Sequence, residues 1–170
     1  MPAASDPVST ESSRDSLFAS RRRVIMGDVD AAGILYFAAP YRWLEEAFTG
    51  WLKQVGHPLG ASLREGSGCP CVTSATSYSV PLVLDDEIDL SLRASSIGTT
   101  SFSVTVEAVR PSDGAVAVRS TAWHVWSQFD GQAEVPVVVP VPLPDWLRKE
   151  LAEAPLTHPV QTVHPLESRD

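Results

Sequence analysis

The most regular hydrophobic pattern in the chain lies between Pro40 and Val55, where apolar residues recur at steps of three and four. That spacing is the period of one buried face of an α-helix. Pro40 suits the first helical position, whereas Gly56 is a natural stop and Pro58 prevents the helix from resuming. The sequence therefore predicts one long helix with a single buried face, formed by Tyr41, Leu44, Phe48, Trp51, Leu52 and Val55.

From residue 71 onward, apolar and polar residues alternate, which is the period of a β-strand with one buried face. Turn-forming residues separate the alternating runs, so we expect consecutive hairpins and an antiparallel meander. One further strand, 17–26, is predicted before the helix. The strands predicted after the helix cover 71–84, 87–97, 100–110 and 115–129.

A single long helix with a buried face needs apolar cover, and a curved antiparallel sheet wrapped around it is the simplest packing. We therefore predict an α+β fold with a five-stranded sheet around one central helix. Segment 56–68 is polar and glycine-rich, as in a loop with a short helical turn. Residues 135–144 contain four prolines and cannot form a central strand. Asp145 is a candidate cap for a short helix that ends near Glu153.

The chain of 170 residues is long enough for one domain with a sizeable core, which we place at 17–153. Residues 1–16 have the composition of a disordered tail, and we expect the proline-bearing segment 154–170 to be loose. No run approaches the ~20 apolar residues of a membrane helix. The N-terminus lacks the apolar core of a secretory signal, so we expect a cytoplasmic protein.

Candidate chemistry is concentrated in the segment that leads into the helix, 27–46. It begins with Asp28 and Asp30, passes through small residues around Gly33, and reaches the helix N-terminus. The first backbone N–H groups of a helix lack intrahelical acceptors and favour negative charge. A carboxylate beside such donors can act as a base or nucleophile next to an oxyanion site, which is what acyl transfer requires.

This segment resembles the signature of the 4-hydroxybenzoyl-CoA thioesterase family of hotdog-fold enzymes. One departure is Ala39, where many members carry Asn before the helix. The resemblance is strongest over 23–55 and extends over the predicted strands to residue 129. It implies the hotdog fold and a cofactor-free acyl-CoA thioesterase. The matching residues are Asp28, Asp30, Gly33, Ile34, Tyr36, Phe37, Tyr41, Arg42, Trp43, Leu44 and Glu45.

The resemblance assigns the chemical step to Asp30, whose carboxylate either attacks the thioester carbonyl or activates water. The alternative is that Asp30 only shapes its turn. The backbone N–H of Phe37 is the candidate oxyanion donor, because it lies where the helix begins. We expect Asp28 to be structural, since two neighbouring carboxylates would raise one pKa. Candidate substrate-binding residues, which could equally be a turn glycine and core aromatics, are Gly33, Tyr36 and Tyr41.

The net charge of −8 argues against a nucleic-acid-binding protein. It also means that an anionic CoA substrate needs a local basic patch. The only dense cationic run is formed by Arg21, Arg22 and Arg23. We consider these arginines candidates for binding the CoA phosphates; the alternative is that they are solvated side chains on a strand.

The chain has two cysteines, Cys69 and Cys71, separated by one residue. They are too close for an unstrained disulfide and too few for a zinc site, so we expect free thiols in a reducing compartment. Neither a serine-hydrolase elbow nor a metal-binding motif occurs, and we expect no metal. The histidines form no convincing catalytic set, and we expect His124 to be structural; they are His57, His124, His158 and His164.

The leading interpretation is an acyl-CoA thioesterase that releases a carboxylic acid and CoA, with an aryl group such as hydroxybenzoyl or dihydroxynaphthoyl. The alternatives are a medium-chain or carrier-protein acyl thioesterase and a non-catalytic acyl-CoA-binding module. A hotdog hydratase pairs Asp with a His five residues on, where this chain has Leu35. Open sheet edges predict a homodimer. The resemblance implies an active site between protomers and dimers that assemble into tetramers.

Overall fold

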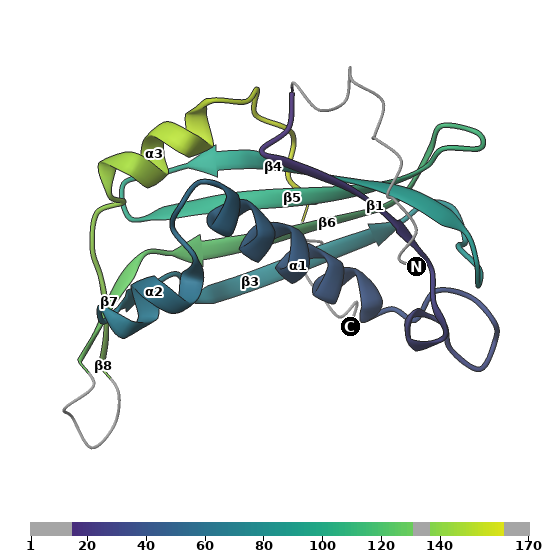
Figure 1. Cartoon of the computed structure of the whole chain (residues 1–170), viewed down its shortest axis with the longest axis horizontal. Helices are drawn as coiled ribbons and strands as arrows, with labels where there is room; N and C mark the ends of the chain where they lie inside the picture. Colours follow the sequence, from purple (N-terminus) through teal and green to yellow (C-terminus); the bar gives the residue numbers. More distant parts are fainter. Residues whose placement is uncertain (1–14, 131–136, 162–170) are drawn as a thin grey trace, which may run out of the picture.

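Residues 15–130 and 137–161 are described by a computed structural model, in which one long helix lies diagonally across a five-stranded antiparallel sheet (Figure 1). The strand order is β1-β4-β5-β6-β3. This arrangement confirms the predicted α+β architecture. The elements are β1 (Phe18–Arg23), α1 (Ala39–Gln54), β3 (Cys71–Tyr78), β4 (Glu87–Ile97), β5 (Ser101–Arg110) and β6 (Ala115–Val125).

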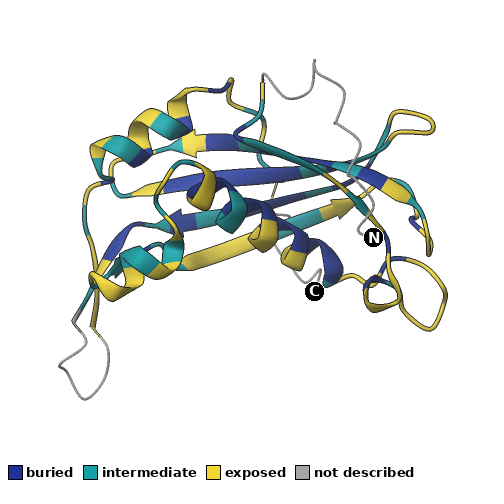
Figure 2. Ribbon diagram, in the orientation of Figure 1, coloured by how far each residue is buried: buried dark blue, intermediate teal, exposed yellow. Residues whose placement is uncertain are grey.

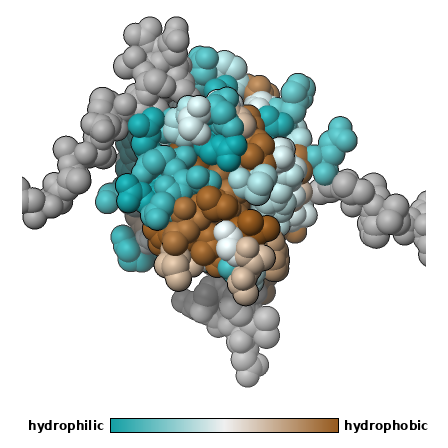
Figure 3. Space-filling model, turned by 90° about the vertical axis from the view of Figure 1, so that its right-hand side faces the viewer, coloured by the Kyte–Doolittle hydropathy of each residue, from teal (hydrophilic) through white to brown (hydrophobic). Residues whose placement is uncertain are grey.

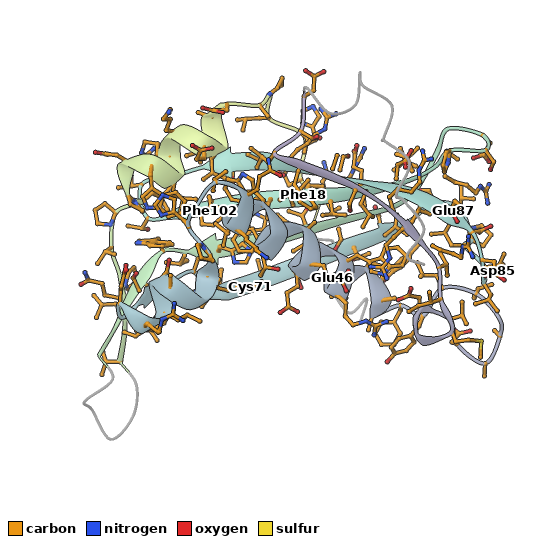
Figure 4. The ribbon with its side chains drawn as sticks, viewed as in Figure 1. Phe18, Glu46, Cys71, Asp85, Glu87 and Phe102 are labelled. Atoms are coloured by element: carbon orange, nitrogen blue, oxygen red, sulfur yellow. The ribbon has the colours of Figure 1, made fainter. Side chains whose placement is uncertain are left out.

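The helix α1 packs one face against the sheet and ends as its sequence predicts. Gly56 follows it with φ +86°, the left-handed conformation that commonly terminates a helix. Phe48 contacts the rings of Phe102 on β5 and His124 on β6 (Figure 4 labels Phe102). The prediction that Tyr41 belongs to the buried face is wrong, because this residue is 38% exposed. The residues of α1 that are buried are Ala39, Pro40, Trp43, Leu44, Ala47, Phe48, Trp51 and Leu52.

The predicted meander of four consecutive strands is wrong, because β3 and β4 are not neighbours. β3 pairs with β6, and β4 pairs with β1 and β5, so only β4, β5 and β6 are joined as consecutive hairpins. Segment 79–86 connects β3 to β4, and it bonds to the loop before α1 through Leu35 N–H and the Leu82 carbonyl at 2.8 Å. Alternation along a strand determines which side chains face the core, but it carries no information about which strand lies alongside.

Three predicted strands are shorter than expected. β1 ends at Arg23 instead of continuing to residue 26, and a 3-10 helix, Met26–Asp28, follows it. β3 ends at Tyr78 instead of continuing to residue 84, and Pro81, which has no N–H to donate, lies in the connection that follows. β6 ends at Val125, and the chain continues as β7 (Ser127–Asp130) in a second sheet. That sheet has the order β2-β7-β8, with β2 at Ser67–Gly68 and β8 at Val137–Pro140. As the prolines predicted, β8 is an edge strand.

Two short helices complete the described structure. α2 (Leu59–Arg64) occupies the predicted loop after α1. α3 (Asp145–Ala152) buries Leu147 and Leu151. The predicted cap is wrong by one residue: Pro144 is the N-cap, and Asp145 is the first helical residue. Within the described ranges, no helix is long and apolar enough to cross a membrane.

The segment after α3 contacts the sheet over the part that is described. Thr157 N–H donates to the Ala94 carbonyl, and Val160 N–H donates to Thr121 Oγ1, both at 2.9 Å. Ala154 is buried. Residues 154–161, which we expected to belong to a loose tail, are therefore bonded to the sheet. The predicted N-terminal tail, apart from its last two residues, lies outside the described residues, as does the end of the C-terminal one.

Candidate active site

The loop between β1 and α1 is a tight turn centred on Gly33. Gly33 has φ +78°, in the left-handed region that favours glycine. Its N–H donates to the Asp30 carbonyl at 3.0 Å, and Asp30 N–H donates to the Ile34 carbonyl at 2.9 Å. A Cβ on Gly33 would meet nothing within 4 Å. The glycine is therefore required by the backbone conformation of the turn and not by a close neighbour.

Asp30 lies at the mouth of a cavity of about 380 Å³. Its Oδ1 accepts a hydrogen bond from Ala32 N–H at 2.8 Å, so the turn-shaping role considered from the sequence is present. Its Oδ2 has no hydrogen-bond partner among the described residues, and the side chain is exposed. One carboxylate oxygen is thus available for chemistry. The cavity is lined by Asp30, Ile34, Leu35, Phe37, Tyr78, Ser79, Val80, Pro81 and Leu82.

The turn that joins this loop to α1 contains a backbone amide without an acceptor among the described residues. Tyr36 N–H donates to the Asp28 carbonyl at 2.7 Å, and Ala39 N–H donates to the Tyr36 carbonyl at 2.9 Å. Phe37 N–H, which lies between these two bonded amides, has no acceptor among the residues that the structure describes. Phe37 and Asp30 line the same cavity, and their roles as oxyanion donor and catalytic carboxylate stay predictions.

Asp28 is buried, and its carboxylate is surrounded by four hydrogen-bond donors. Its carboxylate accepts bonds from Arg22 Nη2 at 3.2 Å, Arg42 Nη2 at 3.0 Å and Trp43 Nε1 at 3.2 Å. Ile25 N–H adds a fourth bond at 3.2 Å. Burial acts to raise the pKa of Asp28, but the hydrogen bonds and the two guanidinium groups outweigh burial and lower it. Of the two neighbouring carboxylates, Asp28 is therefore not one whose pKa is raised.

Neither of the two candidate tyrosines borders the Asp30 cavity in the single chain. Tyr36 is exposed, with its ring 4.8 Å from that of Phe37. Tyr41 lines a second cavity of about 260 Å³ between α1, β3 and β6. Cys69 and Cys71 border this second cavity and are both free thiols, as predicted. Roles for the tyrosines in substrate binding stay predictions.

The three consecutive arginines lie on β1 and each has an acidic neighbour. Arg21 pairs with Asp89 at 2.7 Å and Arg23 with Glu87 at 2.8 Å, both across to β4. Arg22 is different, because it points the other way and bridges Asp28 and Glu46. Arg22 therefore supports the loop, whereas phosphate binding by Arg21 and Arg23 stays a prediction.

The histidines that the structure describes do not approach Asp30. His124 is buried, and its Nδ1 lies 2.9 Å from the Cys69 carbonyl, so its ring is a structural part of the core, as predicted. His57 stacks on Trp146 with ring centres 3.7 Å apart. In the described part of the chain, no three His, Cys, Asp or Glu side chains are grouped to hold a metal. His164 lies outside the described residues.

Sequence reasoning missed one wall of the cavity. The sequence predicts one long strand through Tyr78 and segment 79–82. In the structure β3 ends at Tyr78, and Tyr78 and segment 79–82 line the cavity together with Asp30. The available signal was Pro81, because proline within a predicted strand argues against a continuous ladder. Nothing in the local sequence marks Tyr78.

A model of the thioesterase-like superfamily matches residues 24–151, which include both walls of the Asp30 cavity and every strand of the central sheet except β1. The chain belongs to the thioesterase-like superfamily. A relative from Thermosynechococcus vestitus, a 1,4-dihydroxy-2-naphthoyl-CoA hydrolase, is 30% identical over 139 residues, covering 79% of this chain and 90% of the relative. The resemblance to hotdog thioesterases is thereby confirmed.

Solved structures support the same fold for this superfamily member. A gentisyl-coenzyme A thioesterase is 25% identical and aligns with a TM-score of 0.67, over 79% of this chain and 99% of the other. A 1,4-dihydroxy-2-naphthoyl-CoA thioesterase from Synechocystis aligns with a TM-score of 0.69 at 21% identity, over 79% of this chain and 94% of the other. The central sheet and helix of this chain are therefore those of a hotdog fold.

Proposed function

We propose that the protein hydrolyses acyl-CoA thioesters, with Asp30 as the catalytic carboxylate and Phe37 N–H as the oxyanion donor. The observation that carries this proposal is the shared cavity, which is lined both by Asp30, with one carboxylate oxygen unbonded, and by Phe37, whose N–H has no acceptor among the described residues. A thioester carbonyl is electrophilic and a thiolate is a good leaving group, so little further activation is needed.

The reaction follows from these two groups. Asp30 either attacks the acyl carbon or takes a proton from the water that attacks it. The carbonyl oxygen gains negative charge and is stabilised by Phe37 N–H, which needs no reorganisation because no other acceptor competes for it. Collapse of the adduct breaks the C–S bond and releases CoA as a thiol. If Asp30 is the nucleophile, water then hydrolyses the acyl-aspartyl anhydride; both routes give the carboxylic acid.

The acyl group that we propose is aromatic. Most of the lining is apolar, with Ile34, Val80, Pro81 and Leu82 as large contributors, and the volume of about 380 Å³ is in the ordinary range for a small-molecule site. The named relatives act on dihydroxynaphthoyl- and gentisyl-CoA, which supports an aryl-CoA here. A medium-chain or carrier-bound acyl group and a non-catalytic binding role are the alternatives.

A thiol-release assay with matched acyl-CoA substrates tests this function. We expect kcat/KM for hydroxybenzoyl- and dihydroxynaphthoyl-CoA to exceed that for octanoyl-CoA by about tenfold or more. A preference for octanoyl-CoA, or turnover only when the acyl group is attached to a carrier protein, would identify a different substrate. Tight binding of every acyl-CoA without thiol release would identify a binding module.

The active unit that we propose is a dimer paired through β3. This strand forms one edge of the sheet, and most of its residues are exposed (Figure 2). An uncovered edge of eight residues offers unpaired N–H and C=O groups to a second chain. The end of the molecule seen in Figure 3 also carries an apolar patch, and the loops there expose Ile25, Met26, Ile34, Phe37, Val83 and Leu84. Such a patch is typical of an interaction surface.

We expect light scattering at micromolar concentration to give at least twice the chain mass of 18.3 kDa. Val72, which is 61% exposed on β3, provides a variant, because Val72→Lys places two like charges at a two-fold interface. The matched control is Val139→Lys on β8, where the valine is 49% exposed. Only the first variant should shift the mass toward that of the single chain. A fully active protein of single-chain mass would contradict the dimer.

Arg21 and Arg23 remain our candidates for binding the CoA phosphates. The exposed Arg23–Glu87 pair contributes little stability, so Glu87 does not prevent Arg23 from binding an anion. The Arg21–Asp89 pair is bidentate and partly buried, so Arg21 is the less available of the two arginines. We expect Arg21→Gln combined with Arg23→Gln to raise KM several-fold and leave kcat nearly unchanged. The effect should shrink in high salt and for a truncated thioester that lacks the nucleotide. Equal losses on CoA and truncated substrates would show that the arginines support the fold instead.

A further inference from the structure

Three residues with polar side chains line the Asp30 cavity, and two of these side chains already have a role. Asp30 accepts a hydrogen bond from Ala32 N–H through Oδ1, and its Oδ2 is the oxygen proposed for the chemical step. The Tyr78 hydroxyl donates to the Phe37 carbonyl. The third residue is Ser79, which is exposed and whose hydroxyl has no hydrogen-bond partner in the described part of the chain. Neither the fold nor the proposed chemical step uses this hydroxyl.

Ser79 belongs to a wall of the cavity whose backbone is held at both ends. Ser79 N–H donates to the Ala117 carbonyl of β6 at 2.9 Å. Three residues further on, the Leu82 carbonyl accepts a hydrogen bond from Leu35 N–H at 2.8 Å, and Pro81 between them has a fixed φ. A side chain on a held backbone keeps its place when a ligand enters, which is what selective recognition of a ligand group requires.

The remainder of this wall is apolar, since Ser79 is followed by Val80, Pro81 and Leu82, which also line the cavity. Small-molecule sites are typically of this kind, with a mainly apolar lining and a few polar groups that fix the orientation of the ligand. An aromatic ring with a hydroxyl group can replace the water on Ser79 by a direct hydrogen bond. A ring without one would cover the serine hydroxyl and leave it unpaired, which costs free energy.

We propose that Ser79 is a specificity-determining residue, whose hydroxyl binds a hydroxyl group on the aromatic ring of the acyl group. The enzyme then selects hydroxylated aryl-CoA thioesters over unsubstituted ones. This inference rests on the proposed function and narrows its substrate class. The ring does not react, so its hydrogen bond to Ser79 is equally strong in the bound substrate and in the transition state. Loss of the bond should therefore raise KM and leave kcat nearly unchanged.

Thiol release from benzoyl-CoA and from its 3-hydroxy and 4-hydroxy derivatives tests this selection. For the wild type, we expect kcat/KM for at least one hydroxylated substrate to exceed that for benzoyl-CoA by about tenfold. In Ser79→Ala, this ratio should fall to about two or less, mainly through a higher KM for the hydroxylated substrate. The variant should fold normally, because the hydroxyl that it lacks is exposed and bonds to none of the described residues.

The matched control is Ser77→Ala, which removes another exposed serine hydroxyl near the same end of β3. Ser77 does not line the Asp30 cavity, so this variant should keep the wild-type ratio. A wild type without the preference, or a tenfold preference that survives in Ser79→Ala, would overturn the proposal. An equal loss of kcat on benzoyl-CoA and its hydroxylated derivatives would also overturn it, because Ser79 would then act in the chemical step.

A binding measurement without turnover keeps this test separate from the proposed function. The probes are S-benzyl-CoA and its 3-hydroxy and 4-hydroxy derivatives, thioethers with CH₂ in place of the acyl carbonyl. By calorimetry, the wild type should bind one hydroxylated thioether about tenfold more tightly than S-benzyl-CoA, and Ser79→Ala should bind the two equally. Equal binding by the wild type would refute the role of Ser79. If the wild type released no thiol from any acyl-CoA, the proposed function would fail, while these dissociation constants would still report whether Ser79 selects the ring hydroxyl.

Discussion

Replacing Asp30 with Asn is expected to lower kcat by about 10²–10⁴ while leaving the fold intact. The fold should survive because, within the described residues, the native carboxylate accepts one hydrogen bond, from Ala32 N–H to Oδ1 at 2.8 Å, and the Asn carbonyl oxygen can accept the same bond. The free Oδ2 is what the substitution removes. An amide can neither attack a thioester effectively nor take a proton from water at neutral pH.

Steady-state thiol release gives kcat and KM for this variant, and circular dichroism together with the unfolding temperature establishes that it folds. Asp145→Asn is the matched control, since it removes one charge from an exposed carboxylate on α3. It should retain wild-type kcat. Near-wild-type turnover by Asp30→Asn would remove Asp30 from the chemical step and leave only its role in the turn.

The helix and the approach to it could be predicted from the sequence because their determinants are local. The spacing of apolar residues places α1 to within one residue at each end, and Gly33 and Gly56 both have positive φ. Local capping, turn and periodicity rules depend on neighbouring residues alone. Tyr41 is the exception on α1, because an amphipathic residue at the border of the buried face can point either way.

What could not be predicted depends on contacts between distant parts of the chain. Segment 79–86 crosses from β3 at one edge of the sheet to β4, and this places β3 beside β6. The alternation of residues within a strand does not predict which strand lies next to it. The same crossing brings Tyr78 to Phe37, so the second wall of the cavity was missed together with the topology. The sequence therefore predicts the part of the site that lies in segment 27–46, and it does not predict the wall formed by Tyr78 and segment 79–82.

Asp28 shows the same limit in its electrostatics. From the sequence, its most obvious charged neighbour is Asp30, and a second carboxylate would raise a pKa. In the fold, the backbone turns Asp28 away toward Arg22 from β1 and Arg42 from α1. The pKa of Asp28 is lowered, against the effect of burial, by the hydrogen bond from Ile25 N–H together with the two arginines from these other elements. The structural role expected for Asp28 is therefore present, and it makes a strong prediction about stability.

Asp28→Asn is expected to reduce the free energy of unfolding by about 2 kcal/mol, because it weakens buried, charge-assisted hydrogen bonds to two arginines, although Arg22 keeps Glu46 as a second partner. The carboxylate is 2% exposed and links β1, the loop and α1, so no water replaces the lost interaction with Arg22, whose side chain is only 18% exposed. Chemical denaturation at pH 7 measures the difference. The control is Asp113→Asn, which also removes a carboxylate paired with an arginine, but in solvent, and should cost far less.

The effect should also depend on pH with a defined sign. The pKa of Asp28 is lower in the folded protein than in the unfolded chain, so its stabilisation is fully present above the unfolded value of about 4 and is lost as pH falls through the folded value. The stability difference between wild type and Asp28→Asn should therefore be constant from about pH 5 to 7 and shrink progressively below about pH 4. If this stability difference grew on acidification, the effect of burial on the pKa of Asp28 would outweigh that of the arginines, and the ionised carboxylate would destabilise the folded protein.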